Sequence, residues 1–201
     1  MQIQTIVVGD YQVNCYILSA DQKNAIVIDP GFEHGKITKL LAQEGLTPRI
    51  IINTHGHADH IGTNRAWGLP IWIGEGDAAF LNDPARNLSA FFDAPVTSPK
   101  AERTLQDGEV CEAYGMTFTV LTTPGHTPGG ICLLFDDCVF TGDTLFYASV
   151  GRTDLPGSDP RAIIPAINDK LMVLDDRIAV YPGHGPATTI GFERANNYFL
   201  R

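Results

Sequence analysis

The chain has 201 residues, of which 44% are hydrophobic and 18% are charged. This length suits one compact domain, and we expect residues 1–201 to fold as a single unit whose core needs no disulfide bridges. With 14 Lys and Arg against 23 Asp and Glu, the formal net charge is −9. An acidic chain without a basic block is not expected to bind nucleic acid or an anionic membrane surface.

The cellular compartment follows from the apolar runs and the cysteines. No apolar run reaches the roughly 18 residues of a membrane span, and the first residues lack the pattern of a secretory leader. The four cysteines form no CxxC pair and lie in apolar stretches, at Cys15, Cys111, Cys132 and Cys138. We therefore expect buried, reduced thiols, no membrane association and a cytoplasmic protein.

The first part of the chain predicts strands, a helix and another strand. β-Branched runs bounded by Gly, Pro and Asp predict strands at 3–8, 15–18 and 25–28. Helical spacing of apolar residues predicts a helix over 37–44. The run 49–53 has no polar alternation, which is typical of a strand covered on both faces. Helices at 60–67 and 77–81 are expected on either side of a strand at 71–73.

Residues 82–100 form the one long irregular stretch. They carry Leu88, Phe91 and Phe92 among prolines and small polar residues. Long loops with apolar residues often act as lids or binding loops, and the same rings can also fill the edge of a core. Both interpretations stay open from the sequence.

Strands return after residue 102, with helices towards the end of the chain. The expected strands lie at 110–113, 116–121, 131–135, 138–140 and 178–181, and the expected helices at 162–174 and 188–200. The order of strands followed by helices, twice over, predicts an α/β (α+β) protein in which two sheets pack face to face with helices outside. No GxGxxG or GxxxxGK[ST] pattern is present, so a nucleotide site has no support.

The most informative segment is 54–60, which reads Thr-His-Gly-His-Ala-Asp-His. It places His55, His57, Asp59 and His60 directly after the apolar run 49–53. The i, i+2 spacing around a glycine suits a tight turn at a strand end, unlike the HExxH pattern on a helix. Neutral imidazole nitrogen and carboxylate oxygen are ligands for zinc, iron and manganese.

Three further metal-ligand candidates occupy similar positions. His126, Asp143 and His184 each follow a glycine at the end of an apolar run. A single histidine of this kind is ordinarily a solvated loop residue or a satisfied core residue, but the complete set favours a metal site. His34 is expected on the surface at a helix start. Asp29 is either a turn cap or a partner that holds an imidazole by its other nitrogen.

This constellation, from Asp29 through the HxHxDH run to His184, resembles the metallo-β-lactamase superfamily. The resemblance implies a four-layer αββα sandwich with two divalent metal ions. By resemblance, His55, His57 and His126 hold the first ion, whereas Asp59, His60 and His184 hold the second. Asp143 would bridge the two ions. Zinc is the expected metal, and iron or manganese is the alternative for the same ligands.

The segments 142–146 and 151–157 resemble the glyoxalase II group, in particular its short single-domain bacterial members. This likeness implies a metal-dependent hydrolase that cleaves a 2-hydroxyacyl thioester similar to S-lactoylglutathione. The attacking group would be a hydroxide bridging the metals, with Asp143 as the bridging ligand and Asp59 as both ligand and proton acceptor. A thiol with a pKa near 8.5 leaves without a strong general acid, so a thioester fits better than an amide.

The substrate residues and the activity have alternatives. Arg152 is expected to pair with a substrate carboxylate or, structurally, with Asp154. Tyr147 is expected to line the pocket or to pack in the core. The Gly-Arg-Thr-Asp segment at 151–154 also resembles a segment of the mononuclear iron persulfide dioxygenases, which makes that activity an alternative. A non-catalytic binding module, a nuclease and a lactone hydrolase are further alternatives. The expected partner is a small-molecule thioester, and the oligomeric state stays open.

Overall fold

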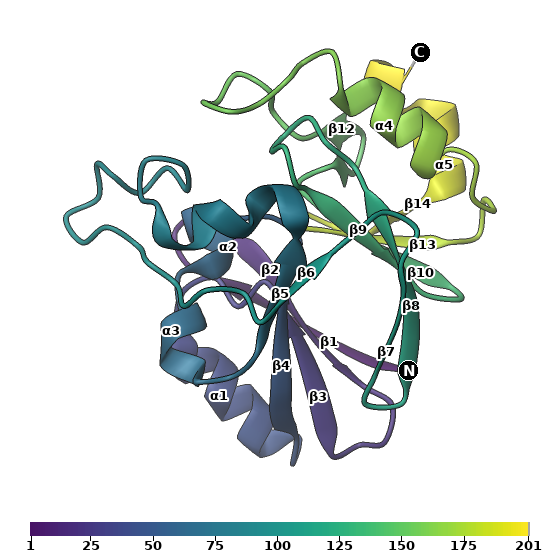
Figure 1. The fold of residues 1–201 in the computed structure, drawn as a ribbon. Coiled ribbons are helices and arrows are strands. Elements are labelled where there is room, and N and C mark those ends of the chain that lie inside the picture. The colour runs from purple at the N-terminus through teal and green to yellow at the C-terminus, as the bar shows by residue number, and fades with distance from the viewer. Residues whose placement is uncertain (201) are drawn as a thin grey trace.

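Two mixed six-stranded sheets pack face to face in the computed structural model, which describes residues 1–200 (Figure 1). The first sheet has the order β1-β2-β3-β4-β5-β6, and the second has the order β14-β13-β10-β9-β8-β7. The strands of the first sheet are β1 Gln2–Val8, β2 Val13–Ser19, β3 Asn24–Ile28, β4 Thr47–Asn53, β5 Ile71–Gly74 and β6 Arg103–Leu105. Those of the second are β7 Val110–Ala113, β8 Met116–Thr122, β9 Ile131–Leu134, β10 Cys138–Gly142, β13 Ala179–Pro182 and β14 Thr188–Thr189.

The main core lies between the two sheets. Ile50 and Ile52 of β4 face it together with Phe118 of β8 and Phe140 of β10. Ile51, between the two β4 residues, instead joins a cluster on the outer face of the first sheet. Both faces of β4 are therefore buried, as the absence of polar alternation in this run predicts.

Helices cover the outer faces of both sheets and complete four layers (Figure 1). Helix α1 (His34–Gln43) packs Ile37 and Leu41 on the first sheet. Helices α4 (Ile163–Lys170) and α5 (Ile190–Asn196) pack Ile163, Ile167 and Ile190 on the second. The predicted αββα sandwich is confirmed. No helix within residues 1–200 is long and apolar enough to cross a membrane.

Two predicted helices next to the site are shorter or tighter than expected. The helix predicted over 60–67 is wrong as one element, because α2 (Ala58–Ile61) and α3 (Asn64–Trp67) are separated at residues 62–63. The helix predicted over 77–81 is a 3₁₀ helix, η1 (Glu75–Asn82). His34 does begin α1, but it is half-buried and its ring packs edge-on against Trp67 at 4.5 Å.

The C-terminal predictions also need correction. Helix α4 ends at Lys170, short of the predicted boundary at 174, and the helix predicted over 188–200 is divided into β14, α5 and the 3₁₀ helix η2 (Tyr198–Leu200). Sequence reasoning missed strand β6 and the hairpin of β11 (Leu145–Phe146) and β12 (Ser149–Val150). These strands have two or three residues, too few to display a hydrophobic period.

The strand directions bring the predicted ligand loops to one edge of the sandwich. Strands β10 and β13 are parallel, and β8 runs the same way because both β8 and β10 are antiparallel to β9. Their C-terminal ends therefore meet at one edge of the second sheet. Hydrogen bonds join this edge to the first sheet, from Ile131 N–H to the Thr54 carbonyl at 2.9 Å and from the Tyr16 hydroxyl to the Pro182 carbonyl at 2.6 Å.

We predict that Phe140→Ala lowers the free energy of unfolding by about 3–5 kcal/mol, because it leaves a cavity between the sheets. The Phe140 ring is fully buried and lies 4.9 Å from Tyr16 and 5.1 Å from Tyr181, measured between ring centroids. Urea denaturation of the metal-free protein measures the change. The matched control is Phe91→Ala, whose 99% exposed ring should cost less than about 0.5 kcal/mol. Equal losses in the two variants would contradict this account of the core.

Candidate metal centre

The HxHxDH run spans the turn after β4 and most of the short helix α2. His55 and His57 lie in the turn, whereas Asp59 and His60 lie on the short helix α2. Gly56 allows the turn to pack against η1, because a Cβ atom there would collide with the Cβ atom of Phe80. The tight turn expected from the i, i+2 spacing is therefore present.

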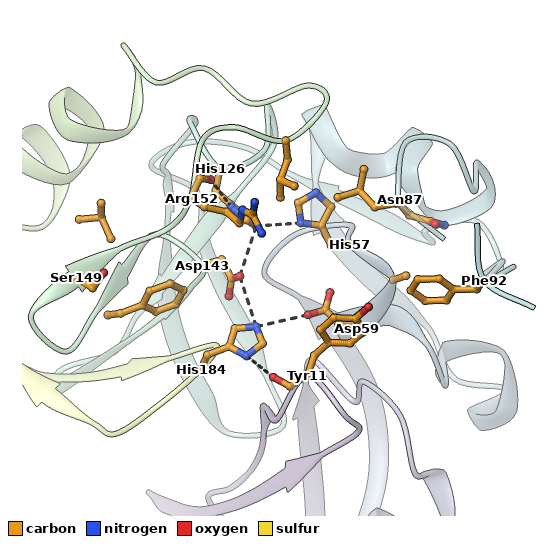
Figure 2. A pocket seen from close by; sticks show the side chains of 15 residues that line it. Tyr11, His57, Asp59, Asn87, Phe92, His126, Asp143, Ser149, Arg152 and His184 are labelled. Carbon is orange, nitrogen blue, oxygen red and sulfur yellow. Dashed lines mark hydrogen bonds and ion pairs between the residues drawn. The ribbon is translucent and has the colours of Figure 1, made fainter. Parts of the chain in front are cut away.

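Two histidines from this turn and one from the second sheet form the first cluster. One nitrogen each from His55, His57 and His126 lie within 4.8 Å of one another, and all three residues are buried. The Nδ1 atom of His57 is 2.9 Å from Nε2 of His126. Nδ1 of His126 donates to the Arg152 carbonyl at 2.8 Å, which directs its Nε2 lone pair into the cluster (Figure 2).

The second cluster combines the helix α2 residues with the last ligand loop. Atoms of Asp59, His60 and His184 lie within 4.8 Å of one another. Nδ1 of His184 donates to the carbonyl oxygen of Tyr11 at 2.9 Å, so its Nε2 faces the carboxylates (Figure 2). A backbone carbonyl can only accept, and it thereby fixes the tautomer of this ring as Arg152 does for His126.

Asp143 lies between the two clusters, at the C-terminal end of β10 (Figure 2). Its Oδ2 atom is 3.4 Å from Nε2 of His126 and 3.5 Å from Nε2 of His184, and its Oδ1 atom is 3.4 Å from Nε2 of His60. Gly183 permits this approach, because a Cβ atom there would collide with the Asp143 carboxylate. One carboxylate thus faces imidazoles of both clusters.

Asp29 underlies the site from the end of β3. Its Oδ2 atom accepts from the Thr54 hydroxyl at 2.6 Å and lies 2.9 Å from Nδ1 of His60, and its Oδ1 atom accepts from the Thr54 N–H at 2.8 Å. The Thr54 hydroxyl is in turn 3.2 Å from Nδ1 of His55. This carboxylate therefore orients imidazoles of both clusters through their far nitrogens.

Burial keeps His55 and His57 of the first cluster neutral. Burial, followed by the nearby His126 ring, lowers the pKa of His57 to about 3. Burial, together with the surrounding histidines, lowers the pKa of His55 well below its ordinary value. Neutral imidazoles keep a lone pair for a metal ion at pH 7.

The second cluster attracts positive charge. Burial on its own lowers the pKa of His60, but the carboxylates of Asp59, Asp29 and Asp143 outweigh it and raise the pKa to about 10. Three carboxylates around one fully buried ring create a negative site. A divalent cation meets this demand for positive charge.

The donor set fits divalent metals on a second ground. Within residues 1–200, Nε2 of His55, Nε2 of His57 and Oδ1 of Asp143 are buried without a hydrogen-bond partner. Buried polar atoms without partners are costly, and such atoms are expected where an ion binds. Imidazole nitrogens with carboxylate oxygens suit zinc, iron or manganese.

A cavity of about 490 Å³ opens above the two clusters. Its wall is mainly apolar and includes Leu88, Phe92, Phe146, Val150 and Leu155. The rings of Tyr11 and Phe92 stack at the pocket with centroids 6.4 Å apart (Figure 2). The neighbouring Phe91 does not line the pocket and is 99% exposed. The stretch 82–100 thus contributes part of the pocket wall through some of its apolar residues.

The structure separates the two predicted substrate residues. Arg152 lines the pocket and forms a bidentate pair with Asp154 at 2.7 and 2.8 Å. The predicted pair with Asp154 is therefore present, and the position at the pocket is compatible with the predicted contact to a substrate carboxylate. Tyr147 does not line the pocket, because its ring stacks on Phe192 with centroids 4.9 Å apart. Its neighbour Phe146 lines the pocket instead.

Sequence reasoning missed Tyr11 and Asn87, which both line the pocket. Gly9 before Tyr11 signals a turn, but no local pattern shows that this turn meets the His184 loop 173 residues away in the chain. Asn87 holds its loop together by donating to the carbonyls of Phe80 and Val96 at 3.1 and 3.0 Å. Both roles depend on tertiary contacts.

The chain belongs to the metallo-β-lactamase superfamily, whose family model matches residues 8–184. It is 36% identical over 208 residues to the hydroxyacylglutathione hydrolase GloC of Haemophilus influenzae, with 100% of this chain and 98% of that protein covered. These two likenesses support a metal-dependent hydrolase.

Two solved structures resemble this chain over nearly their whole length. The crystal structure of BLEG-1 B3 metallo-β-lactamase has a TM-score of 0.93 and 37% identity, with 99% of each chain covered. The structure of TTHA1623 in a di-iron-bound form has a TM-score of 0.86 and 36% identity, covering 98% of this chain and 100% of that one.

We predict that the chelator-treated protein binds two equivalents of Zn²⁺ and that metal removal lowers its melting temperature. An ion that binds only the folded state adds about 2.7 kcal/mol of stability at a free concentration one hundred times its dissociation constant. Calorimetric titration and thermal unfolding measure both effects. A His184→Ala variant should retain one equivalent. A wild-type stoichiometry of one would contradict two functional clusters.

Proposed function

We propose that the protein is a metal-dependent thioester hydrolase that acts on a small 2-hydroxyacyl thioester similar to S-lactoylglutathione. The observation that carries this proposal is the position of Asp143 between two His and Asp clusters at the floor of a pocket of about 490 Å³. The full-length likeness to a hydroxyacylglutathione hydrolase supports the choice of substrate.

The proposed ligands divide between the clusters. His55, His57 and His126 would hold one ion and Asp59, His60 and His184 the other, with Asp143 reaching both. When bound, the two ions supply a water nucleophile ionised near neutral pH and polarise the carbonyl oxygen of the substrate.

The chain's own residues supply orientation and proton transfer. Asp59 lines the pocket, and its Oδ2 atom lies 3.5 Å from Nε2 of His184. We propose this carboxylate as the acceptor of the proton that the nucleophile loses. The apolar wall of Leu88, Phe92 and Val150 limits the access of bulk water to the acyl group.

The leaving group favours a thioester over an amide. A thiol has an ordinary pKa near 8.5 and departs as thiolate at neutral pH, whereas an amine needs a proton donor. Apart from the proposed metal ligands, Arg152 is the one charged residue that lines the pocket among the described residues, and its guanidinium does not release a proton near pH 7. We therefore propose a thioester, because its leaving group needs no general acid.

We further propose a cytoplasmic location, which accords with four buried cysteines that form no disulfide.

We propose zinc as the resident metal, since the ligands are imidazoles and carboxylates, with iron or manganese as the alternative. Metal analysis of the protein purified without added metal tests this choice. Iron in excess of zinc would favour a di-iron form like that of TTHA1623.

Thiol release from S-lactoylglutathione tests the proposed function. We expect metal-dependent hydrolysis that falls by about 100-fold or more in Asp143→Ala, a loss of about 2.7 kcal/mol of transition-state stabilisation. A chromogenic cephalosporin serves as the amide substrate in parallel, given the likeness to a B3 metallo-β-lactamase. Cephalosporin hydrolysis without thioester hydrolysis by the metal-loaded protein would overturn the proposal.

We predict that Arg152→Ala raises KM for S-lactoylglutathione by about tenfold, with kcat nearly unchanged, if the guanidinium binds a substrate carboxylate; this equals about 1.4 kcal/mol of binding. Arg177→Ala is the matched control, because Arg177 forms the same kind of exposed pair with Asp175 at 2.9 Å and does not line this pocket. Equal kinetics for the two variants would leave Arg152 with a surface pair only.

A further inference from the structure

We propose that Asp77 is a positioning residue that fixes both loops of the first cluster in their metal-binding arrangement before an ion binds. This inference rests on the proposed ligands His55, His57 and His126. Asp77 lies on η1, outside the HxHxDH run and outside the pocket wall. Because this side chain does not line the pocket, it would act through the backbone of the ligand loops.

The contacts of Asp77 join the two sheets. Its side chain has no exposed surface. Its Oδ2 atom accepts from the Gly56 N–H at 2.9 Å, and its Oδ1 atom accepts from the Gly129 N–H at 2.7 Å. Gly56 lies between His55 and His57, and Gly129 lies in the loop that carries His126. One carboxylate therefore connects the loop after β4 with the loop after β8.

The loops have little freedom to adopt another arrangement around this carboxylate. A Cβ atom on Gly56 would collide with Phe80, and a Cβ atom on Gly129 would collide with the backbone of Gly76 and Asp77. Both loops are thus in van der Waals contact with η1 at the points where they donate. Close packing on one side and a fixed acceptor on the other determine the distance between the loops.

The buried carboxyl of Asp77 is suited to hold the two ligand loops in position. Burying a carboxylate is costly unless hydrogen bonds compensate it, and no Lys or Arg pairs with Asp77 within residues 1–200. Two backbone N–H groups provide that compensation, one for each oxygen of the Asp77 carboxyl. Because Asp77 already holds the two loops together, less conformational entropy is lost when a metal ion binds.

Asp77 and Asp29 act on different parts of the centre. Asp29 contacts Thr54 and His60, which both belong to the first sheet and its following helix. Asp77 reaches across to the second sheet through Gly129. Loss of Asp77 should therefore weaken the first cluster, where the two sheets each contribute histidines.

The test measures metal affinity directly. Metal-free proteins in a His184→Ala background, which isolates the first cluster, are titrated with Co²⁺ against a competing chelator and followed by visible absorption. Asp77→Asn keeps the side-chain shape but replaces one acceptor oxygen with an NH₂ group that faces a backbone N–H. We expect a 10–100-fold weaker Co²⁺ affinity, the usual effect of removing a partner behind the ligands, and an altered d–d spectrum.

Glu193→Gln is the matched control. Glu193 is also fully buried and also accepts from a backbone N–H, that of Ala148, together with the Thr188 hydroxyl at 2.7 Å. It touches neither cluster's loops in these contacts. Its variant should lower the melting temperature while leaving the Co²⁺ affinity and spectrum of the first cluster unchanged.

The outcomes separate positioning from stability. An Asp77→Asn variant with wild-type Co²⁺ affinity and a lowered melting temperature would overturn the inference while leaving the proposed function intact. Absence of Co²⁺ binding by the wild-type protein would overturn both. If Asp77→Asn does not fold, amide hydrogen exchange of the metal-free wild-type protein decides. Slow exchange of the Gly56 and Gly129 amides supports the inference that the loops are arranged before metal binds. Fast exchange that slows only on metal binding would contradict it.

Discussion

The burial of negative charge is the constraint on which the site depends. Three carboxylates, from Asp29, Asp59 and Asp143, surround His60, and that imidazole has no exposed surface. Uncompensated charges cost several kcal/mol each in such an environment. The chain meets part of this cost with backbone and hydroxyl donors to Asp29 and with the contact between Asp29 and Nδ1 of His60. Divalent cations meet the remainder, so the fold and the metal content depend on each other.

The strand order makes this concentration of charge possible. Parallel relations among β8, β10 and β13 bring three separate loops to one edge, and β4 contributes its loop from the other sheet. In the loops after β8 and β13, a backbone carbonyl also fixes the tautomer of the histidine, that of Arg152 for His126 and that of Tyr11 for His184. The scaffold thus determines both where the imidazoles lie and which nitrogen is free.

Much of this arrangement could be predicted from the sequence, because the signals are local. Histidines and aspartates directly after apolar strands mark strand-end loops, and the two-sheet architecture follows from the order of the elements. The direction in which side chains point from very short strands could not be predicted. Tyr147 and Phe146 are neighbours, and only the pairing of a two-residue strand directs Phe146 into the pocket and Tyr147 onto Phe192. The carbonyl of Tyr11 likewise acquires its role through a contact that no local pattern encodes.

The stacked rings of Tyr11 and Phe92 have a consequence for how the family diversifies. They come from the β1–β2 turn and from the irregular stretch after η1, and neither segment contributes a proposed ligand side chain. Changes at the entrance can therefore alter which molecules enter while the reactive floor stays the same. Relatives of nearly equal identity carry the names of a hydroxyacylglutathione hydrolase and of a β-lactamase. The entrance rings and the side chains of the proposed ligands thus lie on separate segments, while the turn of Tyr11 meets the His184 loop through its backbone carbonyl.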